Sequence, residues 1–202
     1  MDPLTIETYE QEALEYDRET APFWDQFPPA FIDDFAVLLP KPARVLNSGS
    51  GPGRDGALLF AAGLNVICLD GSQRMVDMSK KRGLFSVQGD FLHLPFDEKS
   101  FDGVWAYTAF LHVKKTDFPR ALYEASRMLR GKGILALGMI EGEGETYRQS
   151  SGVPLPRLFA YYQPAELERF LADAGFTVLS QSRFSPGGKY TYLNILAQKD
   201  IL

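Results

Sequence analysis

From residue 43 onward, short apolar runs alternate with segments whose apolar positions recur at helical spacing. The runs are nearly continuous, which is typical of strands covered on both faces, and the alternation predicts a mostly parallel sheet built from βα units. The predicted strands are "ARVLN" (43–47), "NVICLD" (65–70), "LFSVQ" (84–88), "FDGVWAY" (101–107) and "GILALGMI" (133–140).

Helices are predicted between these strands. Ser72 is placed to cap one of them, Gly63 follows the end of another, and Pro119 lies in the first turn of a third. The predicted helices are "RDGALLFAAG", "SQRMVDMSKKR", "DFPRALYEASRMLR" and "QPAELERFLADAG".

The end of the chain breaks the parallel pattern. "FTVLSQSRF" and "YTYLNILAQK" are joined by the turn-rich linker "SPGGK", which predicts an antiparallel hairpin. A parallel sheet that ends in a hairpin is more specific than a generic doubly wound fold.

The first 40 residues differ from the rest in both pattern and charge. "TIETYEQEALEYDRET" spaces Ile6, Tyr9, Ala13 and Tyr16 along one helical face, and an aromatic, proline-bearing stretch follows. The segment carries ten acidic residues and one basic residue, whereas the remainder carries 16 and 20. We expect residues 1–40 to form a helical, aromatic lid on a compact domain of residues 41–202, since so short a segment cannot fold alone.

Composition restricts the partners. The acidic leader disfavours nucleic acid and anionic membranes, and no apolar run is long enough to span a bilayer, so a small molecule is the expected ligand. The N-terminus lacks the pattern of a signal peptide, which predicts a cytoplasmic protein. One cysteine, Cys68, lies in a predicted strand, and two histidines leave little material for a metal site, so none is expected.

The stretch "RVLNSGSGPGRDG" (44–56) lies between a predicted strand and a helix, where α/β sheets bind ligands. Two glycine patterns overlap in it. From Gly51 it is the dinucleotide fingerprint G-x-G-x-x-G with Gly53 and Gly56, and from Gly49 it is G-x-G-x-G, which suits a ligand without phosphates. Asp70, at the end of the second strand, is suited to ribose hydroxyls in both cases.

The residues around the third and fourth strands distinguish between the two interpretations of the glycine loop. "GDFLHLPFDEKSFDGVWA" places Asp90 beyond strand three, followed by "LPF" and "SFD". With the glycine loop, these motifs resemble the class I S-adenosylmethionine-dependent methyltransferases, in particular the small-molecule enzymes of the type 11/25 group, from about Ala43 to Lys199. In this interpretation Gly56 falls in the first helical turn by accident.

The resemblance implies a Rossmann-like sheet of order 3-2-1-4-5-7-6 with strand seven antiparallel, and S-adenosylmethionine as cofactor. It also implies a role in cofactor binding for each residue that matches the family's motifs. The loop would hold the methionine part, Asp70 the ribose, Gly71 and Met75 the adenine faces, Asp90 its amine and the Phe91 amide a ring nitrogen. Ala106 would line the methyl channel and Tyr16 would cover the cofactor. The loop residues are Ser48, Gly49, Ser50, Gly51 and Gly53.

The chain departs from the family pattern at two positions. The family usually has an acid where this chain has Asn47, and often a cysteine at Ser50. Asn47 keeps a carbonyl acceptor for the cofactor's ammonium but lacks the charge, which predicts binding weaker by about 1–2 kcal/mol.

Candidate residues for the acceptor side follow the fourth strand and lie in the long 142–162 connection. His112 is a candidate general base with a pKa near neutrality, and Tyr107 is a candidate for contact with the acceptor. Arg157 and Tyr161 are candidates for binding an anionic or aromatic acceptor, and the connection itself is long enough to be a functional lid.

The sequence predicts a methyltransferase acting on a small molecule, and three alternatives stay open. A non-catalytic relative that only binds the cofactor is favoured by Asn47. A methyltransferase of the tRNA wobble-uridine type shares the "LPF" and "SFD" motifs. A nicotinamide-dependent oxidoreductase would use Gly51, Gly53 and Gly56, but it leaves Asp90 and the hairpin unexplained.

Overall fold

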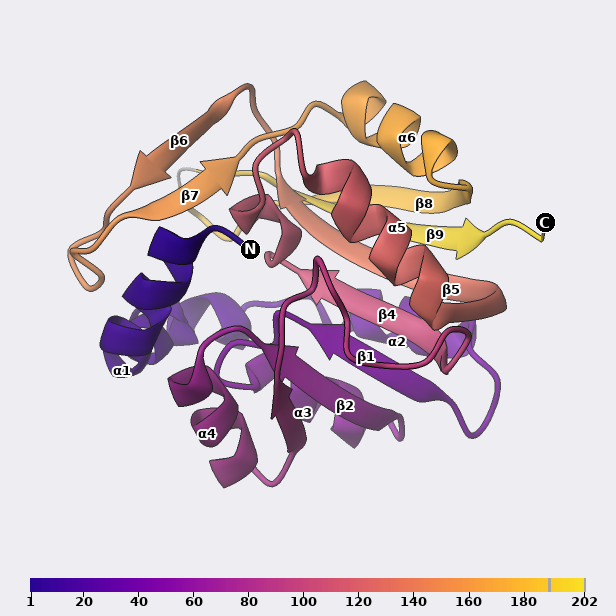
Figure 1. The fold of residues 1–202 in the computed structure, drawn as a ribbon, viewed down its shortest axis with the longest axis horizontal. Coiled ribbons are helices and arrows are strands. Elements are labelled where there is room, and N and C mark those ends of the chain that lie inside the picture. Colours follow the sequence, from indigo (N-terminus) through magenta and orange to yellow (C-terminus); the bar gives the residue numbers. More distant parts are fainter. Residues whose placement is uncertain (189, 202) are drawn as a thin grey trace.

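The fold is known from a computed structural model, which describes residues 1–188 and 190–201. Its centre is a seven-stranded sheet of order β3-β2-β1-β4-β5-β9-β8 (Figure 1). The first five strands are parallel neighbours, and β9 runs antiparallel to both β5 and β8. This confirms the predicted Rossmann-like order with one antiparallel strand. The strands are β1 (Arg44–Ser48), β2 (Asn65–Asp70), β3 (Phe85–Gln88), β4 (Phe101–Tyr107), β5 (Leu129–Ile140), β8 (Phe176–Phe184) and β9 (Tyr192–Lys199).

The terminal hairpin forms between the segments that the sequence indicated. β8 has the predicted bounds, and β9 begins two residues later than expected. Its register pairs Phe176 with Lys199 and Phe184 with Tyr192. The last residue of the "SPGGK" linker, Lys189, lies outside the described residues.

Helices cover both faces of the sheet. Figure 1 shows α5 and α6 on the near face and α2 on the far face. Ser72 caps α4 as predicted, because its hydroxyl accepts from the Met75 amide at 3.2 Å. In the described chain the helices are α1 (Pro3–Asp25), α2 (Pro29–Val37), α3 (Arg54–Ala61), α4 (Gln73–Lys81), the short 3₁₀ helix η1 (Phe110–His112), α5 (Phe118–Met128) and α6 (Pro164–Asp173).

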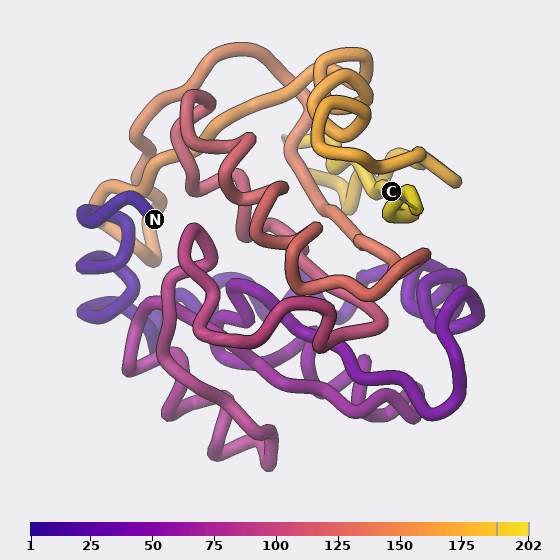
Figure 2. The backbone as a smooth tube through the Cα atoms, turned by 45° about the vertical axis from the view of Figure 1, so that its right-hand side comes forward, coloured from indigo at the N-terminus to yellow at the C-terminus, as the bar shows by residue number. Residues whose placement is uncertain are grey.

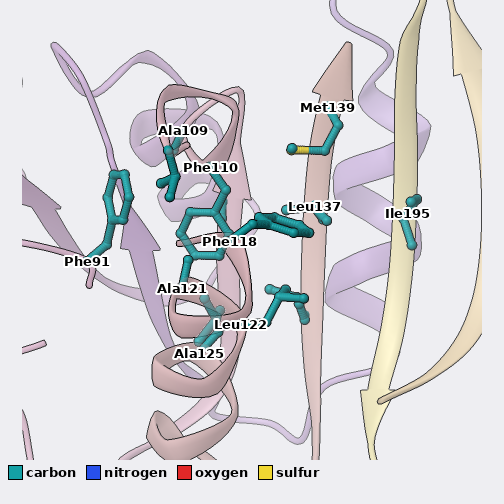
Figure 3. Packing of buried hydrophobic residues seen from close by; sticks show 14 of the residues in the cluster. Phe91, Ala109, Phe110, Phe118, Ala121, Leu122, Ala125, Leu137, Met139 and Ile195 are labelled. Carbon is teal, nitrogen blue, oxygen red and sulfur yellow. The ribbon is translucent and has the colours of Figure 1, made fainter. Parts of the chain in front are cut away.

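Two apolar cores form, one on each side of the sheet. On one side, Ala121, Leu122 and Ala125 of α5 pack toward Leu137 of β5, as Figure 3 shows. On the other side, α2 and α3 pack on Val45, Trp105 and neighbouring strand residues. Nearly continuous apolar strands are therefore required, because every central strand is buried on both faces.

The connection after β5 forms a small antiparallel arm that the sequence pattern did not predict. Its strands are β6 (Glu145–Arg148) and β7 (Arg157–Ala160). Figures 1 and 2 show this arm beside α1, and the Thr8 hydroxyl donates to the Pro156 carbonyl at 2.7 Å. Two segments far apart in the chain, α1 and the arm, thus meet above the carboxyl ends of the strands. No helix in the described residues is long and apolar enough to cross a membrane.

Candidate active site

The glycine loop follows β1 and is fixed by backbone contacts to β2. The amides of Gly49 and Ser50 donate to the Leu69 carbonyl at 2.8 and 2.9 Å. Gly49 and Gly51 have φ values of +76° and +50°, and a Cβ at Gly49 would clash with Ala109. Glycine is therefore required at position 49 both for its backbone conformation and for the close approach of the loop after β4.

Above this loop lies a cavity, called here the loop cavity. It is lined by Gly49, Ser50 and Gly51, but not by two residues that we expected in the same role. Ser48 is fully buried, and Gly53 begins α3 in the left-handed conformation, where a Cβ would lie 2.6 Å from the Ser79 hydroxyl. The other lining residues include Tyr9, Tyr16, Trp24, Asp55, Asp70, Met75, Phe91, Tyr107, Thr108, Ala109 and His112.

Asp70 closes β2 at the wall of the loop cavity. Its carboxylate accepts from the amides of Gly51 at 2.8 Å and Ser72 at 2.9 Å, so its position is set by both neighbouring loops. Burial raises the pKa of Asp70 to about 6, although these amide donors oppose the shift. Met75 lines the cavity beside it, while Gly71 packs on Met1 and Ile6, where a Cβ would not fit.

Asp90 lies at the expected place beyond β3, but its carboxylate already has partners. It accepts from the amino group of Met1 at 3.0 Å and from the Leu92 amide at 2.8 Å. Phe91 lines the loop cavity, whereas Ala106 is fully buried in the core and does not. Phe91 therefore lies at the cavity, whereas Ala106 lies in the core behind the cavity wall.

Asn47 does not line the cavity; Asp55 does. Asn47 is fully buried and its amide nitrogen donates to the Asp55 carboxylate at 2.8 Å. Asp55 also accepts from the Gly56 amide at 2.8 Å and the Trp105 indole at 3.1 Å. The Asp55 carboxylate thus lies next to Asn47, the position at which the family usually has an acid.

Asp55 has no basic group within 4.0 Å of its carboxylate in the described part of the chain. Burial raises its pKa to about 6 despite three hydrogen-bond donors. The sequence analysis missed this residue. The signal was present in "GPGRDG", which places an acid in the first turn of the helix that follows the loop.

Gly56, the third glycine of the dinucleotide pattern, has a packing role that the sequence did not indicate. It lies in the first turn of α3 as expected, but a Cβ there would lie 2.8 Å from the Cys68 sulfur and 3.3 Å from Asn47 Nδ2. Glycine at position 56 therefore permits close packing of α3 on β1 and β2, which is the role of the third glycine in the dinucleotide fingerprint. Cys68 itself is buried, and burial raises the pKa of its thiol to about 11, which makes it inert.

The helix α1 covers the loop cavity, whereas α2, which lies in the same segment expected to form a lid, packs into the core on the far face of the sheet. Tyr16 lies over the glycine loop, with its ring 3.8 Å from where a Cβ on Gly51 would be. Asp17 pairs with Arg54 at 2.7 Å and with Arg82 at 2.8 Å. The acidic leader is thus attached by ion pairs to the basic remainder of the chain.

His112, in η1, has both ring nitrogens engaged. Nδ1 lies 2.6 Å from the Leu158 carbonyl, which can only accept, so Nδ1 carries the proton. Nε2 of the neutral ring therefore accepts from the Tyr9 hydroxyl at 2.8 Å. Burial, together with the charges of Arg157 and Arg148, lowers the pKa of His112 to about 3, so the near-neutral pKa expected from sequence is wrong.

A second cavity, the aromatic cavity, adjoins the first. Both are lined by the same five residues, Tyr9, Tyr16, Trp24, Thr108 and His112, which form a shared wall. The aromatic cavity is further lined by Glu19, Phe23, Arg148, Arg157, Phe159, Tyr190 and Tyr192.

The remaining candidates for the acceptor side divide between the two cavities and the core. Arg157 lines the aromatic cavity as expected. Tyr161 does not; its hydroxyl accepts from Arg148 at 2.9 Å. Tyr107 contributes its ring to the loop cavity, but it is 2% exposed and its hydroxyl donates to Asn194 at 2.8 Å. We therefore assign Tyr107 to packing beneath the lid.

The fold and the position of the two cavities define a class I methyltransferase architecture. Residues 46–137 match the family described as "Methyltransferase domain". This segment is therefore a methyltransferase domain of the type 11 group of class I S-adenosylmethionine-dependent methyltransferases.

Curated relatives and solved structures agree with this family. A malonyl-[acyl-carrier protein] O-methyltransferase of Methylococcus capsulatus is 35% identical over 153 residues, which are 69% of this chain and 54% of that protein. The chain spans 17–60% of the length of the curated relatives that it matches.

Among solved structures, the complex of DhpI with S-adenosylhomocysteine has a TM-score of 0.78 at 21% identity, and covers 98% of this chain and 97% of its own. A Burkholderia thailandensis 1,6-didemethyltoxoflavin-N1-methyltransferase, solved with its substrate and S-adenosylhomocysteine, has a TM-score of 0.68 at 22% identity, and covers 94% and 88%. These likenesses establish the fold.

Proposed function

We propose that the chain binds S-adenosylmethionine in the loop cavity and transfers its methyl group to a small molecule in the aromatic cavity. The observation that carries the proposal is the pair of buried carboxylates, Asp55 and Asp70, on the wall of a cavity at the carboxyl ends of the strands. Open α/β sheets bind ligands at this edge.

The residues present fit the cofactor's three parts. Asp55, a buried carboxylate without a cationic partner among the described residues, suits the ammonium of the methionine part. Asp70, at the end of β2, suits the ribose hydroxyls, and Met75 and Phe91 supply an apolar slot for the adenine. A charged ligand group at Asp55 would stabilise the ionised carboxylate that burial now disfavours.

When bound, the cofactor supplies a methyl group on a sulfonium that is already activated for in-line displacement. The chain's own residues then have to position an acceptor and exclude water. The shared wall at Tyr9, Thr108 and His112 is where the two cavities meet. His112 Nε2 is occupied by the Tyr9 hydroxyl, so the oxygen of that hydroxyl is the hydrogen-bond acceptor that this pair presents on the shared wall. It is suited to holding a proton-bearing group of the acceptor rather than to removing a tightly held proton.

This arrangement favours acceptors whose nucleophile needs no prior deprotonation, such as an amine or a heteroaromatic nitrogen. The proton released on methylation would leave the site for solvent. Two structural neighbours are N-methyltransferases, the 1,6-didemethyltoxoflavin-N1-methyltransferase and the glycopeptide N-methyltransferase MtfA.

Calorimetric titration tests the cofactor assignment. We expect S-adenosylhomocysteine to bind with one-to-one stoichiometry and NADH to show no heat of binding. NADH binding without S-adenosylhomocysteine binding would replace the methyltransferase with the oxidoreductase. Cofactor binding without product, after a broad acceptor screen with labelled methyl donor, would favour a non-catalytic relative.

A further inference from the structure

Two arginines face each other on the arm that walls the aromatic cavity. Arg148 of β6 and Arg157 of β7 are direct cross-strand partners, and both line this cavity. Like charges directly opposite each other destabilise an antiparallel pair. The arrangement is therefore unfavourable unless a negative charge lies near both.

No side chain in the described residues supplies that charge by direct contact with Arg157. Its side chain is 6% exposed, its Nη2 donates to the Ser150 hydroxyl at 3.1 Å, and its Nε is buried without a hydrogen-bond partner. No carboxylate of the described chain lies within ion-pair distance of it. A buried guanidinium with a free donor is costly, which points to a ligand that completes it.

Arg148 is held by contacts that leave its charge uncompensated. Its guanidinium lies 4.3 Å from the ring centre of Phe159 and 4.1 Å from that of Tyr190, and one of its nitrogens donates to Tyr161. Within the described chain it makes no ion pair. Glu19 also lines the cavity, but it is exposed and accepts from the Ser150 hydroxyl at 2.7 Å. The lining therefore carries two positive charges against one solvated negative charge.

Much of the remaining cavity wall is aromatic. Phe23 packs on Tyr192 with ring centres 4.9 Å apart, and Phe159 packs on His112 at the same distance. Aromatic walls bind planar ligands through stacked and edge-to-face contacts. The cavity thus offers a planar apolar surface that extends from two arginines to the shared wall at His112.

We propose that the methyl acceptor is an aromatic or heteroaromatic carboxylate, with its carboxylate on Arg157 and Arg148 and its ring between the aromatic walls. This assignment deepens the proposed function and rests on it. The arginines fix the end of the acceptor remote from the reaction, so that the nucleophilic atom of the ring is presented at the shared wall. The charge of the two arginines and the planar shape of the aromatic cavity together select the acceptor.

The test is calorimetric titration of the full chain saturated with S-adenosylhomocysteine. Two matched probes, 4-hydroxybenzoate and 4-hydroxybenzamide, differ only at the group that the arginines would meet; a third, tyramine, carries a cation at that end on a two-carbon spacer. We expect the carboxylate to bind at least about tenfold more tightly than the amide, since charge-assisted hydrogen bonds are about twice as strong as neutral ones. The amine is expected to bind most weakly.

Variants then assign this preference to the two arginines. Arg157→Gln and Arg148→Gln should each reduce the affinity for 4-hydroxybenzoate by about tenfold and leave that for the amide nearly unchanged. Arg18→Gln is the matched control, because it removes the same charge from the exposed face of the lid. If Arg157→Gln does not fold, Arg157→Lys and Arg148→Gln carry the test, the lysine variant retaining the preference for the anion.

Each outcome separates the two proposals. The acceptor assignment is overturned if the amide or amine binds as tightly as the carboxylate, if the preference survives in both glutamine variants, or if no probe binds the S-adenosylhomocysteine complex. Failure of S-adenosylhomocysteine itself to bind the wild-type chain would instead overturn the proposed function on which this assignment rests.

Discussion

The hydroxyl of Tyr9 donates to Nε2 of His112 across 2.8 Å, joining the lid helix α1 to the short helix after β4. Because the Leu158 carbonyl holds the proton of the same ring on Nδ1, the imidazole has one defined tautomer. The position of α1 against η1 and the protonation state of His112 are therefore linked.

We predict that His112 stays neutral, with its proton on Nδ1, down to about pH 4, because burial and two nearby arginines lower its pKa to about 3. The measurement is ¹⁵N NMR of the imidazole nitrogens across a pH titration. A midpoint near the ordinary histidine value would contradict the assigned tautomer. Tyr9→Phe should shift the Nε2 resonance without changing the protonated nitrogen.

The contact between Asn47 and Asp55 predicts that exchanging the two side chains restores cofactor affinity lost in the single variants. Asp55→Asn should weaken binding of S-adenosylhomocysteine by about tenfold or more, because it removes the charge that receives the ammonium. Asn47→Asp should be destabilising, since it places two carboxylates at the 2.8 Å contact between these side chains.

The double variant Asn47→Asp with Asp55→Asn should recover much of the affinity, because one carboxylate and one amide are again paired. Calorimetric affinities and melting temperatures of the four proteins form a double-mutant cycle. Additive losses in that cycle would show that Asp55 does not act in place of the family's acid.

Cofactor binding should depend on pH near 6. The pKa values of Asp55 and Asp70 are raised to about 6 in the unliganded chain, so both carboxylates are largely ionised above about pH 7 and increasingly protonated below about pH 6. Because the ligand's ammonium and hydroxyls favour the ionised forms, affinity should fall on acidification and binding near pH 6 should release protons. Titrations in buffers of different ionisation enthalpy measure that release; proton uptake would reverse the inferred sign.

Asp70→Ala should reduce affinity for S-adenosylhomocysteine more strongly than any other change on β2, because it removes the ribose acceptor and frees the amides of Gly51 and Ser72. Circular dichroism checks that the variant is folded. Undiminished binding by a folded Asp70→Ala protein would refute the assignment of Asp70 to the ribose.

The ion pairs of Asp17 should hold the lid in place. Asp17→Asn weakens the contacts to Arg54 and Arg82, so amide hydrogen exchange should accelerate in α1 and stay unchanged in α6. Glu15→Gln serves as control, since its partner Arg18 is exposed. Equal exchange in the two variants would mean that aromatic packing alone holds α1.

The strands and the terminal hairpin were predictable because each strand is a local apolar run bounded by turn residues, whereas the order of the sheet came from the resemblance to the methyltransferase family. Charge distribution set the acidic leader apart, but it did not predict the ion pairs of Asp17 with its two arginines. The arm β6–β7 was not predictable, because "ETYR" lacks the alternation of a half-buried strand and its pairing is set by tertiary contacts.

The roles of individual site residues were less accessible to sequence. Asn47 was expected to face the ligand, yet its amide supports Asp55, a contact that depends on how α3 is oriented on β1. That orientation depends on the close approach of α3 to Cys68 at Gly56. The sequence does not show that these two residues are neighbours. Similarly, the pKa of His112 follows from burial under α1 and the arm, which a linear sequence does not reveal.

The division of the two cavities between chain segments has an evolutionary consequence. The loop cavity draws its carboxylates from the strand and helix repeats, whereas the arginines and most aromatic residues of the aromatic cavity come from α1, the β6–β7 arm and the residues around the start of β9. The arm and the start of β9 do not line the loop cavity, so, on the proposed function, mutation or recombination in these two segments can alter acceptor choice while the donor half is retained. Exchanging the arm between relatives would be a direct way to reprogram such a protein.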